Sequence, residues 1–208
     1  MSTEGVIYRV AGPVVTATGI SPRMYDVVHV GEEQLMGEVI KIVGDYSIIQ
    51  VYEDTSGIKP GEPVTNTGRP LSVELGPGLL TSVYDGIQRP LPVLREKMGD
   101  FIYRGVSAPG LDHSKKWDFV PVAKEGDVIS AGQVLGTVQE GPMVHKIMVP
   151  VDIAKGKIES IRGGSFTIDE TIAVIDGKEV SMLQYWPVRV PRPVLEKYQP
   201  DVPLVTGL

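Results

Sequence analysis

The two lysines that directly follow a glycine are the first candidates for chemistry, because a phosphate-binding loop places Lys after Gly. Such a loop also needs a glycine five residues before that glycine and a Ser or Thr after the Lys. Backbone N–H groups then surround the phosphate, and the hydroxyl holds Mg²⁺. Gly156-Lys157 and Gly177-Lys178 have neither feature. We predict that both glycines lie in β-turns and that neither pair binds a nucleotide.

Histidines and carboxylates are the next candidates, and their pattern does not indicate catalysis. His29, His113 and His145 lack the spacing of a zinc motif, and the chain has no Cys to complete one. An alternating strand pattern around His29 favours a structural role, and we assign no role to His113. The acidic pairs Glu32-Glu33 and Asp169-Glu170 are interpreted as solvated turn residues, and the Gly-x-Ser-x-Gly motif of hydrolases does not occur. The sequence therefore predicts no catalytic, cofactor-binding or metal-binding residue.

Composition restricts the class of protein. The 208 residues include 20 basic and 26 acidic side chains, and the net charge of −6 argues against a nucleic-acid-binding groove. No apolar stretch approaches the roughly 20 residues that span a bilayer. The first residues lack the basic and apolar regions of a signal peptide. A hydrophobic content of 42% supports a folded core, so we expect a turn-rich folded protein whose membrane association is indirect, through partner subunits.

Short β-rich runs separated by turn residues fill the first third of the chain. They lie at 6–10, 14–16, 25–30, 35–43, 46–52, 64–67 and 71–75. This spacing is typical of a small β-barrel or sandwich. Closure into a barrel would remove exposed strand edges, which otherwise invite aggregation. We expect residues 1–75 to form an N-terminal six-stranded β-barrel.

Residues 76–110 are interpreted as a helical and loop connector. Apolar residues at near-helical spacing predict a helix that begins near residue 79, and Pro90 ends it. A second short helix is predicted over 91–97, with Pro92 tolerated in its first turn.

A second β pattern occupies 111–184, where we expect an inserted β domain. The dipeptide Asp176-Gly177 between two β-rich runs is a strong hairpin signal. From residue 185 the chain is rich in Pro and cannot form a helix or a central strand. We interpret 185–208 as an extended linker. A linker with no domain after it indicates that the chain is a piece of a longer protein.

Part of the second β unit resembles a biotinyl or lipoyl carrier domain. Residues 126–140 are similar to the first half of that fold and 156–164 to the second half. The modified Lys of such carriers lies at the tip of a tight hairpin, which here falls near 141–143 and has no Lys. The nearest, Lys146, lies inside a predicted strand at 144–149. A barrel-sandwich fold without the cofactor is therefore preferred, and a carrier module modified at Lys146 is the alternative.

The chain as a whole resembles the catalytic A subunits of archaeal A-type ATP synthases and vacuolar-type ATPases. The resemblance begins with GVIYRVAGPVV at 5–15 and ends with PLVTG at 203–207. Motifs that follow in order between these lie at 37–40, 51–57, 61–64, 75–80, 84–91, 104–106, 116–121, 145–150 and 186–189. Those at 104–106, 116–121 and 145–150 resemble the insertion, or non-homologous region, that distinguishes A subunits from related subunits.

The resemblance implies a structural role for this chain in a rotary enzyme that couples ATP synthesis or hydrolysis to proton or sodium transport. A nucleotide domain with a phosphate loop and a catalytic Glu would follow residue 208 in that family, so ATP and Mg²⁺ belong to the full-length parent and no cofactor is expected here. The chain is then the non-catalytic N-terminal portion of the catalytic A subunit. A stand-alone β-rich binding protein is a further alternative.

The resemblance also implies partners and a location. The barrel would join neighbouring B subunits in the hexameric head, and the inserted domain would contact peripheral stalk subunits. No nucleic-acid partner is expected. The protein would lie on the cytoplasmic side of the cell membrane, held there only through the complex.

Overall fold

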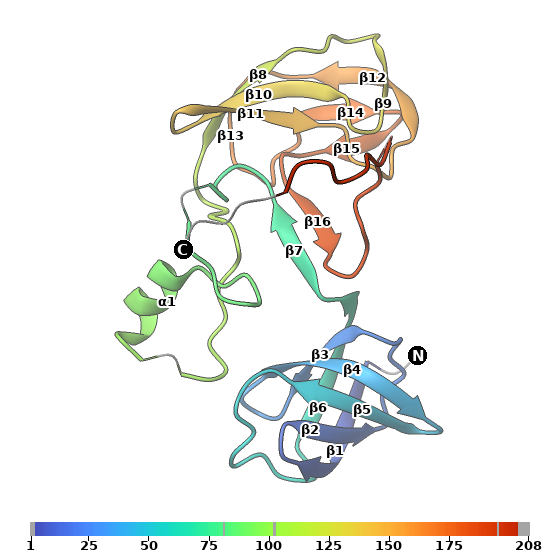
Figure 1. The fold of residues 1–208 in the computed structure, drawn as a ribbon, viewed down its shortest axis with the longest axis vertical. Helices are drawn as coiled ribbons and strands as arrows, with labels where there is room; N and C mark the ends of the chain where they lie inside the picture. Colours follow the sequence, from blue (N-terminus) through green and yellow to red (C-terminus); the bar gives the residue numbers. More distant parts are fainter. Residues whose placement is uncertain (1–2, 81, 102, 195, 204–208) are drawn as a thin grey trace.

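The computed structural model describes residues 3–80, 82–101, 103–194 and 196–203. Over these residues the chain is mostly strand and carries one helix, which confirms the mainly β fold class. A barrel lies at one end of the molecule and a second β-rich unit at the other, with a connector between them (Figure 1). Most of the 203–207 motif lies outside the described residues, as do residues 1 and 2.

Six antiparallel strands close into a barrel in the order β1-β2-β5-β4-β3-β6, which confirms the predicted six-stranded barrel. Their bounds are β1 (Glu4–Ala11), β2 (Val14–Thr18), β3 (Asp26–Val30), β4 (Leu35–Val43), β5 (Tyr46–Val51) and β6 (Pro63–Pro70). Every strand of this ring has a hydrogen-bonded neighbour on both sides, so the barrel presents no long open edge.

Alternating side chains fill the interior of the barrel. Val15 and Ala17 of β2 are fully buried and point into the core, and so does Ile49 of β5, because successive strand residues face opposite sides of a sheet. Gly44, at a φ of +57°, begins the two-residue turn between β4 and β5. Glycine adopts this backbone conformation without steric cost.

The run at 71–75 does not join the barrel, which corrects our expectation that it completes the barrel series. β7 (Ser72–Leu75) pairs instead with β16 (Gln184–Pro187) in a separate antiparallel ribbon. The reason is that β6 already pairs with both β1 and β3, so the closed barrel offers β7 no partner. The start of the Pro-rich segment is therefore a strand rather than an extended linker. The expected domain boundaries after residues 75, 110 and 184 remain predictions.

The connector contains one of the two predicted helices among its described residues. α1 (Leu91–Met98) is present, and Pro92 lies in its first turn. The helix expected from residue 79 is wrong, since Tyr84 instead forms an isolated antiparallel bridge with Pro90. The carboxylate of Asp85 accepts the backbone N–H groups of Ile87 and Arg89, and this local turn competes with helical hydrogen bonding.

The second unit consists of two four-stranded sheets that share one core. The sheets have the orders β11-β10-β8-β13 and β15-β14-β12-β9. The bounds are β8 (Trp117–Pro121), β9 (Val128–Ser130), β10 (Val134–Glu140), β11 (Met143–Met148), β12 (Lys155–Ile161), β13 (Gly164–Phe166), β14 (Ala173–Ile175) and β15 (Lys178–Val180). We call these strands and their loops the barrel-sandwich unit.

Buried side chains from both sheets meet inside the barrel-sandwich unit. Phe119 and Leu135 come from one sheet and Ile158 and Ile175 from the other. The predicted hairpin signal at 176–177 is confirmed, because both turn residues between β14 and β15 have a positive φ, of 46° and 75°.

Candidate functional site

The two Gly-Lys pairs lie in ordinary strand and turn positions. Gly177 is in the β14–β15 turn, as expected. Gly156 lies inside β12 rather than in a turn, which corrects that prediction. A Cβ atom there would lie 2.6 Å from Cγ2 of Ile175, so the strand needs glycine to let β14 approach closely. The residue type reflects packing at this position.

The position of Lys146 argues against the carrier alternative. Lys146 lies within β11 and is paired with Thr137 of β10. The hairpin between these strands turns at residues 141–142, where the chain has Gly and Pro. A lysine held in the middle of a paired strand is poorly presented to a modifying enzyme.

The acidic pairs that we interpreted as solvated turn residues make specific contacts. Glu33 forms an ion pair with Arg104 of the connector, with Oε2 2.6 Å from Nε. Glu170 accepts the backbone N–H of Thr167 at 2.6 Å. Asp169 lies 2.7 Å from a ring nitrogen of His113. The pairs therefore hold loops in place rather than only solvating them.

A row of exposed side chains crosses the outside of the barrel. The register places Val6 of β1 opposite Thr18 of β2. It places Tyr46 of β5 opposite Thr18 on one side and opposite Val43 of β4 on the other. Tyr8 joins them, since its ring lies 4.9 Å from that of Tyr46 between centroids. We call these five residues the barrel row.

The barrel row is apolar and open to solvent. Tyr8 is 58% exposed and Tyr46 is 40% exposed. Two exposed valines flank them in the same row. A contiguous apolar patch on a folded unit is typical of an interaction site, and Tyr is enriched at such sites.

A buried arginine joins the barrel to the connector. Arg89 donates to Asp85 at 2.7 Å, to Glu53 at 2.8 Å and to the carbonyl oxygen of Val106 at 2.7 Å. Burial by itself would raise the pKa of Asp85, but the hydrogen bonds from Arg89 outweigh it and hold that pKa below its usual range. Glu53 belongs to the loop after β5, so Arg89 fixes that loop against the connector.

A buried carboxylate joins the barrel to the segment after β16. Glu38 of β4 accepts hydrogen bonds from Arg189, at 3.0 Å from Nε and 2.5 Å from Nη2. The hydroxyl of Tyr52 donates to the same carboxylate at 3.1 Å. Burial raises the pKa of Tyr52, and the charge of Glu38 adds to this effect. Residues 151 positions apart in the chain are thus held together at the barrel surface.

A second buried carboxylate joins the barrel-sandwich unit to the connector. Glu140, at the end of β10, accepts the backbone N–H groups of Gly78 at 2.7 Å and Leu80 at 3.1 Å. Nδ1 of His145 lies 2.6 Å from its other oxygen. His145 therefore has a structural partner, and the connector is held through main-chain groups.

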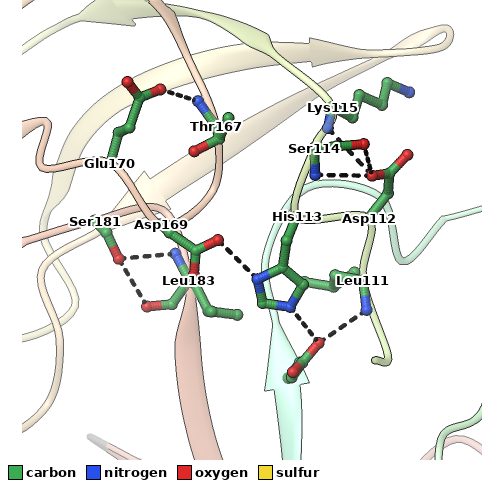
Figure 2. A network of polar contacts seen from close by, with 11 residues as sticks. Leu111, Asp112, His113, Ser114, Lys115, Thr167, Asp169, Glu170, Ser181 and Leu183 are labelled. Carbon is green, nitrogen blue, oxygen red and sulfur yellow. Dashed lines mark hydrogen bonds and ion pairs between the residues drawn. The ribbon is translucent and has the colours of Figure 1, made fainter. Parts of the chain in front are cut away.

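His113 lies between two carboxylates where three segments meet (Figure 2). Its Nδ1 is 2.7 Å from Oδ2 of Asp169, in the loop after β13, and its Nε2 is 3.3 Å from Oε2 of Glu74, in β7. The backbone N–H of Leu111 donates to the same oxygen of Glu74 at 2.8 Å. The sequence assigned His113 no role, because nothing in its local pattern indicates residues 74 or 169.

The remaining histidine has a weaker contact. Nδ1 of His29 lies 3.3 Å from the carbonyl oxygen of Gln34, within the β3–β4 hairpin. Among the described ranges, no group of three or more His, Asp or Glu side chains is placed to hold a metal ion.

A cavity of about 540 Å³ lies where the connector meets the barrel-sandwich unit. Pro77, Pro90 and Leu111 contribute apolar walls, and Trp117 lines it as well. Trp117 is 6% exposed, and its indole N–H is the only buried side-chain polar group without a hydrogen-bond partner in the part of the chain that the structure describes. A buried donor without an acceptor costs free energy, so an acceptor supplied there by another molecule would be favourable.

Two protein-family comparisons match the two β units separately. Residues 7–68 match the ATP synthase alpha/beta family beta-barrel domain, and residues 108–189 match the ATPsynthase alpha/beta subunit barrel-sandwich domain. Within the described residues, no helix has the length and apolar character to cross a membrane.

Curated relatives match nearly the whole chain, and each is the A subunit of an A-type ATP synthase. The relative from Methanoculleus marisnigri is 67% identical over 98% of this chain and 35% of the relative. The relative from Methanospirillum hungatei, numbered 1 in that organism, is 66% identical over 99% and 35%. The relative from Methanosarcina barkeri is 61% identical over 100% and 36%. The chain therefore spans about a third of the length of these relatives.

Proposed function

Because this chain belongs to the ATP synthase alpha/beta family, we propose that it is the N-terminal, non-catalytic assembly portion of the A subunit of a rotary A-type ATP synthase. The parent enzyme would couple ATP synthesis or hydrolysis to proton or sodium transport. ATP and Mg²⁺ would bind in parts of the parent that this chain does not include. The role of this portion is to hold subunits in register while other domains perform the chemistry.

The barrel row is the observation that supports an assembly role most directly. It places two tyrosines and two valines on one outer face of a closed barrel, outside the barrel core. We propose that this face packs against neighbouring B subunits in the hexameric head. The barrel would then form part of a stiff collar, because its closed hydrogen-bonding ring resists deformation.

The barrel-sandwich unit supports a second contact. It lies away from the barrel and is held to the connector through Glu140, so it projects from the rest of the chain (Figure 1). We propose that it contacts peripheral stalk subunits. The protein would lie on the cytoplasmic side of the cell membrane and associate with the membrane only through the complex.

Assembly of the full-length parent protein with its B subunits tests the role of the barrel row. The variant carries Tyr8→Ser and Tyr46→Ser, and native mass spectrometry measures the fraction of A and B in the hexameric head. We expect the double variant to lose most of the hexamer while its barrel stays folded, because both side chains are exposed and neither belongs to the barrel core. Circular dichroism and thermal unfolding of the isolated double variant check that the barrel is intact.

Tyr198→Ser is the matched control. It is the same substitution at a tyrosine that is 83% exposed but lies outside the barrel. We expect this variant to assemble as the unmodified protein does. A double variant that forms the hexamer normally would contradict the proposed barrel contact. ATP turnover by the purified 208-residue chain would contradict the non-catalytic role.

A further inference from the structure

The surroundings of His113 require a particular protonation state. An ionised carboxylate only accepts hydrogen bonds, and a neutral imidazole has only one N–H to donate. His113 faces Asp169 through Nδ1 and Glu74 through Nε2, at 2.7 and 3.3 Å. Both contacts are favourable together when the ring is protonated, because only the imidazolium form donates from both nitrogens.

The two carboxylates are not held equally. Glu74 keeps its position without His113, since its side chain accepts the N–H of Leu111 at 2.8 Å. Its backbone N–H and carbonyl are also bracketed by the amide of Gln88, at 2.6 and 2.7 Å. Asp169 is half exposed, and the hydrogen bond of its side chain within the described residues is to His113. Loss of the proton on His113 would therefore release the Asp169 side first.

The charges around His113 come from four parts of the chain. They are Glu74 on β7, Tyr185 on β16, Arg69 at the end of β6, Asp169 and Glu170 in the loop after β13, and Asp112 and Lys115 beside His113. Asp112 is occupied by the N–H and hydroxyl of Ser114, and the ammonium of Lys115 lies 4.0 Å from the ring centroid of Trp117. Carboxylates ordinarily titrate near pH 4 and Tyr, Lys and Arg near 10 or above, so His113 is the group of this set that changes charge near neutral pH.

Electrostatics agree with the geometry. Partial burial by itself would lower the pKa of His113, but its hydrogen bonds to Asp169 and Glu74 outweigh burial and raise that pKa above its ordinary value. Burial raises the pKa of Tyr185, and the charges of Glu74 and Asp169 raise it further. Both directions are those expected beside two ionised carboxylates.

We propose that His113 is a pH-operated clasp that fastens the 167–171 loop of the barrel-sandwich unit to β7 when its ring is protonated and releases the loop when the ring is neutral. The clasp acts at the base of the unit, where the chain enters it from the connector (Figure 2). It would make the attachment of this unit tighter at lower pH and looser as pH rises through the raised pKa of His113. This inference does not depend on the proposed assembly role.

Histidine titration in the full chain is the first test. Side-chain nitrogen NMR of the unmodified protein follows all three histidines, and His29→Gln and His145→Gln assign the signals by removing one each. We expect His113 to titrate above the ordinary value of about 6.5 and to move toward it in Asp169→Asn. Titration of His113 at or below about 6.5 in the unmodified protein would overturn the proposal, and this measurement needs no variant of His113 to fold.

Hydrogen exchange provides the second test. The backbone N–H of Leu183 donates to the carbonyl oxygen of Ile168 beside the clasp, and that of Ile172 donates to Val180 in the body of the unit. After correction for the intrinsic pH dependence of exchange, we expect the protection of Leu183 to fall roughly fivefold across the titration of His113. The protection of Ile172 should change little.

Two substitutions separate a titrating clasp from general loosening. His113→Gln carries no charge at any pH, so the protection of Leu183 should be low throughout. His113→Lys stays charged through neutral pH, so protection should show no step there. A step that persists in His113→Gln would overturn the proposal, because another group would then be responsible.

Discussion

One methyl group added at Gly136 is expected to destabilise the barrel-sandwich unit severely. Gly136 lies in β10, where a Cβ atom would be 2.4 Å from both Cε2 and Cζ of Phe119 and 2.6 Å from the carbonyl oxygen of Val120. Real Cβ atoms do not approach other heavy atoms this closely. The ring of Phe119 is 2% exposed and packed among core residues, so it has no free space to move into.

The backbone contact makes the strain hard to relieve. The carbonyl of Val120 belongs to β8, which is paired with β10 directly beside Gly136. Moving it away would break the ladder that joins the two strands. Overpacked core substitutions typically cost about 1–3 kcal/mol, and we expect Gly136→Ala to lie near the upper end, at about 3 kcal/mol.

Urea unfolding followed by tryptophan fluorescence measures this cost. The chain has two tryptophans, Trp117 in the core of the barrel-sandwich unit and Trp186 in β16, and neither lies in the barrel. The signal therefore reports the unit that carries Gly136. Gly86→Ala is the matched control, because a Cβ at Gly86 meets no heavy atom within 4 Å and its backbone has no positive φ.

We expect the control to change the free energy of unfolding by less than about 0.5 kcal/mol. Equal urea midpoints for the two variants would show that the clash with Phe119 and Val120 costs nothing. A large effect in both would show that glycine is needed for backbone flexibility rather than for space.

Three further outcomes follow from the buried polar contacts. Arg89→Met should cost about 3 kcal/mol in urea unfolding, because it leaves the carboxylates of Asp85 and Glu53 without their shared cation. The lowered pKa of Asp85 stabilises the fold above its unfolded-state pKa of about 3.9, and this contribution should be lost as pH falls through the folded-state pKa. Asp85→Asn should therefore flatten the acid side of the stability profile, and an unchanged profile would refute this assignment. Glu140→Leu should cost about 2 kcal/mol or more, since two connector N–H groups lose their acceptor, and should speed hydrogen exchange there, whereas the exposed neighbour in Gln139→Leu should change neither.

Much of the fold could be predicted from local patterns. Short alternating runs and regularly spaced turn residues are enough to indicate strands, and the barrel was confirmed on that basis. The hairpin at 176–177 was predictable because its turn type demands those two residues. The resemblance of the ordered motifs to rotary ATPase A subunits was also visible in the sequence, and the relatives agree with it.

Local patterns failed where two segments compete for one partner. Periodicity alone placed 71–75 in the barrel, but the pairing of β6 on both sides excludes β7 from it. Apolar spacing predicted a helix near residue 79, but the side chain of Asp85 satisfies the backbone groups in a turn instead. Gly156 looked like a turn residue and is instead a close-contact position within a strand.

The candidate site shows the same division. Sequence by itself determined that the chain is a β-built scaffold with a barrel and a barrel-sandwich unit, because strand and turn preferences act over a few neighbouring residues. Only the tertiary structure decided which charged side chains meet. His113 finds Asp169 56 positions away and Glu74 39 positions away, and Arg189 finds Glu38 across 151 positions. A contact between distant residues depends on how whole strands pair and pack, and no local pattern in one sequence records that.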